Sequence, residues 1–496
     1  MFTREELLAA AGVQPLGGML PMRFAGGAVD SRVVQRGELF VALRGTQTDG
    51  HRFIGAALRA GAAAILCAEP NAEARARGVP QIVVQDPLDV LQRLAKRHLR
   101  SQPHTRVIAI TGSNGKTSVK EAVASLLQHL APTLKTLGNL NTETGLPLTL
   151  LRLNPEHRFA VLEMGAQWVG EIAALCRIAP PVIAVVTVVG PEHLEFFGSM
   201  ENVAKGESEA VAALPSHGVA ILNDDDKLVR RMARRTKAHV LTYGHRPTAA
   251  VRAMRVGGDP LTGLSFTLAC GDQKARTRLH VPGAHAVTTA LAAASVALCC
   301  GMNVQTAAAA LGEIRPVKRR GEIKRAYNGA TLVDDTYNAN RQSAVAAVEL
   351  LRDAKIIDGA RRWFIFGDML ELGTYSCDEH AAVGEAAAQA VDELVLVGSD
   401  VRATAEAALQ SGMSHEHVHL FAANLNDREA MAAARYGAAT LVRERLQPDD
   451  LALIKGSLGV GMDAIVRELL EQHNGVLRED FPLRTVVPAR RSARLG

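Results

Sequence analysis

The feature that most constrains the fold of this chain is a hydrophobic run that leads straight into a glycine-rich turn containing a lysine. The run is RVIAIT at 106–111, the turn is GSNGKT at 112–117, and the following segment, SVKEAVASLLQHL, has the composition of a helix. Glycines let a backbone turn point its N–H groups at phosphate oxygens, and a helix N-terminus adds a favourable dipole. We therefore predict a strand, a phosphate-binding loop and a helix, in this order.

The residue types of this loop suit a bound nucleotide. Lys116 can neutralise phosphate charge, and the hydroxyl group of Thr117 can ligate Mg²⁺. The full motif has a further glycine where this chain has Ile110, so the loop is a short variant. The alternative is a glycine-rich turn with a solvated lysine. Because strand, loop and helix agree, nucleotide binding is favoured over that alternative.

Short runs of β-branched and other apolar residues alternate with Ala-, Leu- and Glu-rich segments along most of the chain. This alternation predicts βαβ units around mostly parallel sheets, which is an α/β fold. The expected strands lie at 106–111, 159–163, 182–188, 219–222, 331–334, 363–366, 393–397 and 451–455. The expected helices lie near 116–130, 168–178, 199–213, 341–354 and 378–391.

A chain of 496 residues is too long for one hydrophobic core, so we expect three domains. Prolines interrupt helical patterns near Asp86-Pro87 and Arg315-Pro316, and we place the boundaries there. The predicted division is 1–86, 87–314 and 315–475, followed by a flexible basic tail at 476–496.

Charge and composition argue against nucleic acid as a partner. The formal net charge is +5, but residues 481–496 hold four arginines and no acid, so the tail carries most of this excess. A nucleic-acid surface needs a basic patch on a folded face, and an aromatic content of 4% leaves few platforms for stacking bases.

Membrane insertion and secretion are not indicated either. No apolar run reaches the roughly 20 residues of a membrane span. The N-terminal segment carries Glu5 and Glu6 and lacks the apolar core of a signal peptide. The six cysteines show no CxxC spacing, as expected of reduced thiols. We therefore expect a cytoplasmic protein, and we expect a monomer.

Two polar side chains follow predicted strands of the central region. Glu163 ends the FAVLE strand, and His193 follows the VIAVVTV strand. Ligands of open parallel sheets bind beyond the carboxyl ends of the strands, so both side chains are expected near the phosphate loop. For Glu163 a metal role is favoured over a helix-start acid. For His193 a metal ligand and an ordinary loop histidine are equally supported, since His is an atypical Mg²⁺ ligand.

At this point the sequence resembles the Mur ligase family over roughly residues 25–470. Within the family it resembles the type that adds D-alanyl-D-alanine to UDP-N-acetylmuramoyl tripeptide. The motif DDTYNAN with FGDMLELG distinguishes this type from the related ligase that adds the third amino acid. The matching stretches are DSR (30–32), GELFVALRGTQTDGHRFI (37–54), AITGSNGKT (109–117), GNLNTETGLPLTLL (138–151), LEMG (162–165), EHLEFFGS (192–199), VPGAHAVTTALAAA (281–294), LVDDTYNANRQS (332–343), FGDMLELG (366–373) and LALIKGS (451–457).

The resemblance implies an N-terminal α/β domain for the UDP-sugar, a central P-loop ATPase and a C-terminal Rossmann-like domain. It implies ATP and Mg²⁺, with an acyl phosphate formed on the tripeptide carboxylate and then attacked by the dipeptide amine. The implied catalytic residues are Lys116, Glu163, His193 and Glu207, and the implied metal ligands are Thr117, Glu163 and His193. The implied ATP-binding residues are Gly112, Ser113, Asn114, Gly115, Lys116, Thr117, Ser118, Thr289, Arg320, Asp335 and Asn338. The implied substrate-binding residues are Ser31, Arg32, Thr46, Asn139, Thr142 and Asn340.

The two asparagines of the TYNAN motif have an ordinary alternative role. Asn338 and Asn340 lie at a strand-to-helix junction, where asparagine is common in turns and helix caps. Other departures weaken individual contacts: Ala286 and Thr289 replace family asparagines, Arg341 replaces a proline, and Leu458 replaces an arginine.

One departure concerns the metal site. The family places a carbamylated lysine where this chain has Glu207, and the nearest lysine is Lys205. Residues two apart on a helix point about 200° from each other, so only one can face the site. Our hypothesis is that Glu207 supplies the carboxylate directly. The alternative is that Glu207 is solvated and Lys205 is modified after a small shift in register.

Two other functions remain open from the sequence. The changes at 207, 289 and 458 are compatible with a catalytically silent nucleotide-binding relative that serves as a partner or scaffold. A P-loop kinase or a folate polyglutamate-type ligase shares the short loop, although DSR…GTQTDGH and DDTYNAN argue against it. The third residue of the tripeptide is not indicated.

Overall fold

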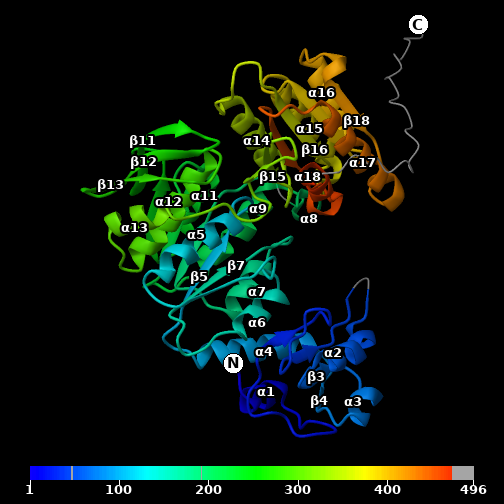
Figure 1. The fold of residues 1–496 in the computed structure, drawn as a ribbon. Coiled ribbons are helices and arrows are strands. Elements are labelled where there is room, and N and C mark those ends of the chain that lie inside the picture. The colour runs from blue at the N-terminus through cyan, green and yellow to red at the C-terminus, as the bar shows by residue number, and fades with distance from the viewer. Residues whose placement is uncertain (46–47, 192, 472–496) are drawn as a thin grey trace.

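The computed structural model describes residues 1–45, 48–191 and 193–471, so the predicted tail at 476–496 lies outside the described residues. Three sheets follow one another along the chain, with four, nine and six strands. Figure 1 shows the N-terminal sheet in blue, the central sheet in cyan and green, and the C-terminal sheet in yellow to red. The fold is therefore α/β with mostly parallel sheets, as predicted.

The N-terminal region is a small parallel sheet covered by short helices. Helix α4 begins at Pro87 behind the N-cap Asp86, and it packs against α1 and against α6 of the central region. It therefore links the two regions. The strands are β1 (Gly27–Ala28), β2 (Leu39–Val41), β3 (Ala64–Cys67) and β4 (Gln81–Val83). The helices are α1 (Arg4–Ala11), η1 (Gly50–Phe53), α2 (Ile54–Ala60) and α3 (Ala72–Ala76), and α4 (Pro87–Arg100) lies between this region and the central one.

The central sheet has the order β13-β12-β11-β10-β9-β8-β5-β7-β6, and only its β11–β13 end is antiparallel. Its strands are β5 (Arg106–Thr111), β6 (Thr133–Lys135), β7 (Phe159–Glu163), β8 (Ile183–Val186), β9 (Val219–Asn223), β10 (His239–Gly244), β11 (Val251–Asp259), β12 (Gly263–Cys270) and β13 (Gln273–Arg278). Its helices are α5 (Lys116–Gln128), α6 (Gly145–Leu150), α7 (Glu171–Ile178), α8 (Leu194–Phe197), α9 (Met200–Glu207), α10 (Glu209–Ala212), α11 (Lys227–Arg231), η2 (Met232–Arg235), α12 (His285–Cys299) and α13 (Val304–Leu311).

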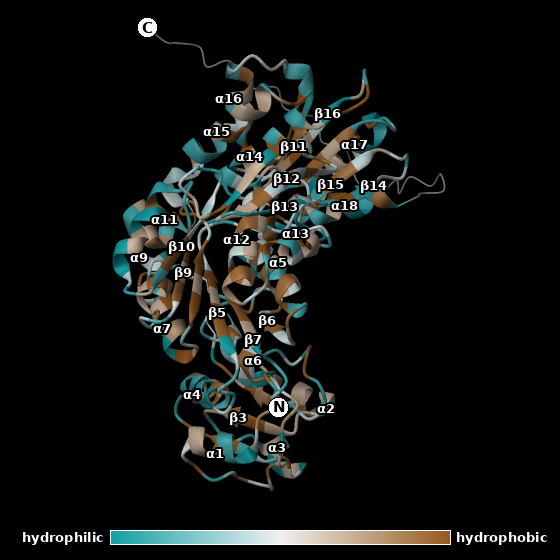
Figure 2. Ribbon diagram, turned by 90° about the vertical axis from the view of Figure 1, so that its left-hand side faces the viewer, coloured by the Kyte–Doolittle hydropathy of each residue, from teal (hydrophilic) through white to brown (hydrophobic). Residues whose placement is uncertain are grey.

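Helices cover both faces of the central sheet, so its strands carry apolar side chains on both faces. Strand β5 is buried from Val107 to Thr111; Ile108 and Ile110 pack with α5, α12 and α13, while Val107 and Ala109 belong to the core on the other face. Figure 2 shows these strands in brown between partly teal helices. Parallel strands buried in this way read as continuous hydrophobic runs, which is why the sequence revealed them. Strand β5 lies between β7 and β8, so the loops after these three strands are neighbours.

The C-terminal sheet has the order β14-β15-β19-β16-β17-β18, and only β14 is antiparallel. Its strands are β14 (Glu322–Arg325), β15 (Thr331–Asp335), β16 (Arg362–Gly367), β17 (Glu393–Val397), β18 (Val418–Phe421) and β19 (Leu451–Lys455). Its helices are α14 (Arg341–Asp353), η3 (Gly373–Tyr375), α15 (Ser376–Ala388), α16 (Val401–Gln410), η4 (His415–His417), α17 (Arg428–Arg445), η5 (Leu458–Val460) and α18 (Asp463–Leu470).

The predicted strands and helices are all present, with ends shifted by a few residues. The structure adds the antiparallel β11–β13 end, helix α12 and the helices α16 and α17, which the sequence did not indicate. In the part of the chain that the structure describes, none of the helices combines the length and the apolar character needed to cross a bilayer.

Candidate active site

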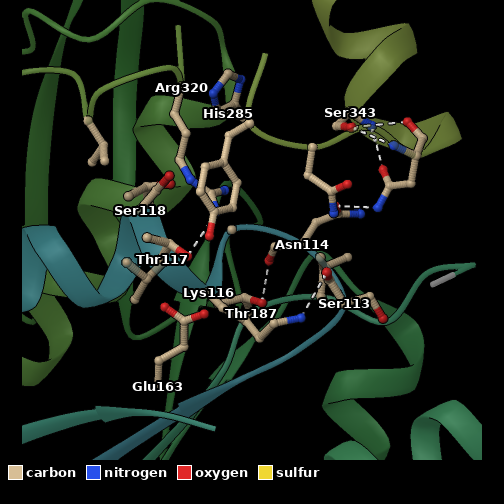
Figure 3. Close-up of a pocket in the computed structure, with 18 of the residues that line it drawn as sticks. Ser113, Asn114, Lys116, Thr117, Ser118, Glu163, Thr187, His285, Arg320 and Ser343 are labelled. Carbon is tan, nitrogen blue, oxygen red and sulfur yellow. Dashed lines mark hydrogen bonds between the residues drawn. The ribbon is translucent and has the colours of Figure 1, made fainter. Parts of the chain in front are cut away.

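A large cavity of about 1000 Å³ lies between the central and C-terminal regions. The phosphate loop and the segments after β7 and β8 line it from the central region, and the segments after β15 and β19 line it from the C-terminal region. Figure 3 shows labelled side chains from both regions directed into one space. Parallel α/β sheets bind ligands at this edge, so the cavity is the candidate active site.

The phosphate loop needs glycine at two positions. Gly112 has a φ of +123°, and a Cβ atom there would lie 2.1 Å from Thr187 Oγ1. Gly115 has a φ of +80° and directly precedes α5, which begins at Lys116. Positive φ angles of this kind are unfavourable for residues with a side chain. The Lys116 ammonium donates a hydrogen bond to the Ser113 carbonyl at 3.2 Å, so it folds back over the loop.

Glu163 lies at the end of β7 with 3% of its surface exposed, and it lines the cavity. Its backbone N–H donates to Thr136 Oγ1 at 3.0 Å, and its Oε1 accepts from Asn141 Nδ2 at 2.9 Å. Among the described residues, the buried Oε2 has no hydrogen-bond partner. Thr117 and Lys116 of the phosphate loop line the same cavity as Glu163 (Figure 3). The geometry therefore leaves one carboxylate oxygen available beside the phosphate loop.

A magnesium ion fits these donors if a nucleotide supplies the rest of its ligands. Within the described ranges, no group of three His, Cys, Asp or Glu side chains is placed to hold a metal ion. Mg²⁺ commonly binds through one or two carboxylates together with substrate phosphates and water. The hydroxyl of Thr117 and the free oxygen of Glu163 suit that arrangement.

His193 lines the same cavity but contacts the C-terminal region. It has a φ of +52°, just before α8, and its Nδ1 lies 2.5 Å from Glu371 Oε2. The hydrogen bond from His193 lowers the pKa of Glu371. Lys116, Glu163 and His193 therefore line one cavity, and the role of His193 as a metal ligand stays a prediction.

Glu207 differs from the expectation for a metal carboxylate. It is 3% exposed and is absent from the residues that line the cavity. Its Oε2 accepts hydrogen bonds from the Gly112 N–H at 2.6 Å and from the hydroxyl of Thr111. The helix spacing argument holds, because Glu207 faces inward and Lys205 is exposed. The correction is that the shorter glutamate ends at the first residue of the phosphate loop and supports its backbone.

The C-terminal region contacts the phosphate loop through three side chains. Arg320 donates to Thr117 Oγ1 at 3.0 Å, and its guanidinium lies 4.0 Å from the ring centroid of Tyr337. Asn340 Nδ2 donates to Asn114 Oδ1 at 2.6 Å, and Asn114 Nδ2 donates to Gln342 Oε1 at 2.8 Å. Asn340 is also the N-cap of α14, so its capping role and its contact with the loop coexist.

Asp335 and Asn338 lie on the same wall of the cavity, held by a lysine. The buried Lys455 donates to Asp335 Oδ2 at 2.6 Å and to the Asn338 carbonyl at 2.9 Å. Strand β15 is paired in parallel with β19, which brings the end of LVDD beside the end of LALIK. The lysine therefore sets the conformation of the segment after β15.

The predicted substrate residues divide between two places. Asn139 and Thr142 line the cavity, together with Ser118 and Thr289 from the nucleotide set. Ser31 and Arg32 lie in a turn after β1, outside the cavity lining, and Arg32 pairs with Asp30 at 2.6 Å. Thr46 lies outside the described residues.

Several residues at the cavity were missed from the sequence. Gln342, Glu371 and Lys455 line it, and Asn141 and Lys120 contact Glu163. Four of these five lie in or next to motifs that were recognised, so their positions at strand and loop ends were a usable signal. Lys120 gave no such signal, because a lysine on a helix is usually a solvated residue.

Comparisons with known proteins agree with this geometry. Family models match in order: the Mur ligase family, catalytic domain, at residues 25–99; the Mur ligase middle domain at 110–297; and the Mur ligase, glutamate ligase domain, at 319–458. The chain is 38% identical over 471 residues to the UDP-N-acetylmuramoyl-tripeptide--D-alanyl-D-alanine ligase of Mycobacterium tuberculosis H37Rv, covering 89% of this chain and 91% of that ligase. It is 35% identical over 450 residues to the ligase of that name from Escherichia coli K12, covering 90% and 93%.

Solved structures give the same result. MurF from Acinetobacter baumannii superposes with a TM-score of 0.81 at 30% identity, covering 95% of this chain and 99% of that one. MurF ligase from Thermotoga maritima in complex with ADP gives a TM-score of 0.75 at 27% identity, covering 90% and 96%. With the cavity, the phosphate loop and all three domain matches in place, this chain belongs to the Mur ligase family and, within it, to the MurF type.

Proposed function

We propose that this chain is an ATP-dependent ligase that joins D-alanyl-D-alanine to the terminal carboxylate of UDP-N-acetylmuramoyl tripeptide. The product is the UDP-muramoyl pentapeptide for peptidoglycan synthesis, and ADP and phosphate are released. The observation that carries the proposal is the single cavity that joins the phosphate loop and Glu163 to the C-terminal segments. The relatives that match about nine-tenths of the chain carry the name of this activity.

The phosphate loop is the proposed site of the ATP triphosphate. The backbone N–H groups of residues 112–117 and the start of α5 provide a positive potential for phosphate oxygens. Lys116 and Arg320 approach the same space from opposite walls and would neutralise phosphate charge. When bound with the nucleotide, Mg²⁺ would withdraw charge from the phosphates, held by Thr117 and Glu163.

In the first step, the tripeptide carboxylate attacks the γ-phosphorus of ATP, ADP leaves, and an acyl phosphate forms. Two negatively charged groups must approach each other, so the largest contribution of this chain is electrostatic. Lys116 and Arg320 are the proposed cations for this step. Asn139 and Thr142, at the central side of the cavity, are proposed to contact the incoming UDP-linked substrate.

In the second step, the dipeptide amine attacks the acyl carbon, and a tetrahedral intermediate collapses with loss of phosphate. The amine gives up its proton as the amide bond forms, and phosphate leaves with the pair of electrons of the broken C–O bond. Asn340 on the C-terminal wall is proposed to position this amine. Asp335 and Asn338 on the same wall are proposed to contact the nucleotide, with Lys455 fixing the segment they belong to.

The contacts between the two walls suit a reaction that must exclude water. Hydrogen bonds from Asn340 to Asn114, from Asn114 to Gln342 and from Arg320 to Thr117 cross the cavity, and His193 pairs with Glu371. An acyl phosphate exposed to water would be hydrolysed, so closure of the cavity protects it.

The remaining assignments are also proposals. We retain the domain division 1–86, 87–314 and 315–475, with the N-terminal domain for the UDP-sugar, and we keep Ser31 and Arg32 as sugar-contact candidates. We infer a cytoplasmic location, because the reaction consumes ATP and a UDP-linked precursor. We also infer that a monomer is sufficient, since both walls of the cavity come from one chain.

Phosphate release from ATP tests the function. The account predicts release only when UDP-N-acetylmuramoyl tripeptide and D-alanyl-D-alanine are both present, with pentapeptide formed in equal amount. Release with folate and glutamate would instead support a folate polyglutamate-type ligase. The absence of release with both substrates would support a catalytically silent nucleotide-binding relative.

A further inference from the structure

Lys120 is a completely buried lysine next to the proposed metal carboxylate. It lies one helical turn after Lys116 on α5, so the two side chains share one face of the helix. Only 1% of the Lys120 side chain is exposed, so water does not solvate the ammonium group. Burial of an ammonium group is costly unless nearby charges compensate it, so Lys120 requires an explanation.

The compensation comes from two carboxylates. Lys120 Nζ lies 3.0 Å from Glu121 Oε1 and 3.8 Å from Glu163 Oε2. Glu121 also pairs with Lys135 of β6. Two acids and two lysines therefore form a small network that is electrically balanced when no metal ion is present.

The contact with Glu163 involves its available oxygen. Asn141 holds Oε1 at 2.9 Å, whereas Oε2 is buried, has no hydrogen-bond partner in the described part of the chain, and has the Lys120 ammonium as its nearby cation. The ammonium fixes the carboxylate by attraction at a distance longer than a hydrogen bond. It therefore leaves the oxygen free to bind another group.

This charge affects a metal ion in two opposite ways. Glu163 attracts a divalent cation, but Lys120 repels it from nearly the same place in a buried site where water screens weakly. A triphosphate on the loop brings several negative charges and offsets that repulsion. The balance therefore favours an ion that is bound together with a nucleotide over an ion that is bound alone.

We propose that Lys120 is a positioning residue for Glu163 that makes metal binding depend on the nucleotide. Its ammonium holds the carboxylate in place, suppresses occupation of the empty loop by a free divalent cation, and permits occupation when a nucleotide is present. The inference rests on the proposed function in taking Glu163 as the carboxylate of a nucleotide-bound metal. It is independent of which peptide the enzyme extends.

Binding of Mn²⁺, a spectroscopic substitute for Mg²⁺, tests the proposal. Free Mn²⁺ is measured by electron paramagnetic resonance with the full chain, with and without a non-hydrolysable ATP analogue. For Lys120→Met we expect Mn²⁺ affinity without nucleotide to increase about tenfold, because one nearby positive charge is lost. The factor by which the analogue tightens Mn²⁺ binding should decrease by a similar amount. Lys135→Met removes a lysine of the same network that is not paired with Glu163, and both quantities should stay within about twofold.

A variant with balanced charge provides a second test if Lys120→Met does not fold. Lys120→Met/Glu121→Gln removes one positive and one negative charge from the network, so the burial of unpaired charge is reduced. We expect it to lower the effect of the analogue on Mn²⁺ binding in the same way. A purely structural role of Lys120 would weaken Mn²⁺ binding with and without the analogue and leave their ratio unchanged, which would overturn the proposal.

The same titrations separate this inference from the proposed function. If the wild-type chain shows no tightening of Mn²⁺ binding by the analogue, the proposed nucleotide–metal site is wrong. If the wild type shows tightening and the Lys120 variants show it to the same extent, the site stands and only the role of Lys120 is wrong.

Discussion

Two glutamates beside the phosphate loop are equally buried and have opposite surroundings. Glu163 and Glu207 are each 3% exposed. One oxygen of Glu207 accepts hydrogen bonds from Gly112 and Thr111, whereas Oε2 of Glu163 has none from the described residues. A carboxylate whose oxygen is occupied by backbone and hydroxyl donors stabilises the fold, while one with an available oxygen can bind a ligand.

The comparison shows that a carboxylate in the right segment is not enough to define a metal ligand. The sequence assigned both glutamates to catalysis because both align with family positions. The structure separates them by the direction and the partners of their side chains. Matched substitutions at the two positions are therefore the sharpest way to test the difference.

The largest effect is expected from Glu163→Gln. Loss of the charge that faces the proposed metal should lower kcat/KM by about 1,000-fold, or about 4 kcal/mol in transition-state stabilisation. The thermal midpoint should fall by no more than about 3 °C: one of the two carboxylates beside the buried Lys120 ammonium is lost, but Glu121, at 3.0 Å, still compensates it. Steady-state phosphate release and calorimetry measure the two quantities. A normal kcat in this variant would show that Glu163 has no role in catalysis.

Glu207→Gln should show the reverse pattern. The charged acceptor for the Gly112 N–H is lost, and the amide group would face donors, so we expect a destabilisation of about 2 kcal/mol. The thermal midpoint should fall by about 5 °C. The KM for ATP should rise as the phosphate loop loosens, with a smaller change in kcat. A large loss of kcat with unchanged stability would instead show that Glu207 acts at the metal site.

Thr111→Val tests the same support from the donor side. The Thr111 hydroxyl is buried and lies within hydrogen-bond distance of two acceptors, Glu207 Oε2 and the Met164 carbonyl (2.9 Å), which share its single proton. Valine keeps the volume but loses the donor, so stability should fall by about 1 kcal/mol. Combined with Glu207→Gln, its cost should be less than additive in a double-mutant cycle. Full additivity would show that the two side chains act separately.

The smallest effect is expected at Lys205. Its side chain is exposed on α9, two residues before the buried Glu207. Lys205→Met should leave kcat and the thermal midpoint unchanged, and intact-protein mass spectrometry should show no carbamate. A carbamate on Lys205, or activity that rises with added bicarbonate, would contradict the assignment of the inward position to Glu207.

Much of the fold was predictable because it depends on patterns that are local in sequence. Strands such as β5 and β7 are continuous apolar runs, and Gly112 and Gly115 mark a turn that requires positive φ. The helix spacing of Lys205 and Glu207 correctly gave one inward and one outward side chain.

The rest depends on contacts between segments far apart in sequence. The hydrogen bond from Asn340 to Asn114 depends on how the two regions pack, and the bond from Lys455 to Asp335 depends on the order of the strands. A local sequence pattern contains neither kind of information. The partner of Glu207 depends on the length of its side chain, because the carboxylate ends beside the Gly112 N–H. Lys120 was missed because only the tertiary structure shows a helical lysine to be buried beside Glu163.

Transfer of oxygen from the tripeptide to phosphate tests the central claim most directly. The terminal carboxylate of UDP-N-acetylmuramoyl tripeptide is labelled with ¹⁸O, the reaction is run with ATP and D-alanyl-D-alanine, and the released phosphate is examined by mass spectrometry. Activation of the carboxylate by the γ-phosphoryl group predicts one labelled oxygen in each phosphate released. Unlabelled phosphate released together with pentapeptide would show that no acyl phosphate forms, and it would contradict the account.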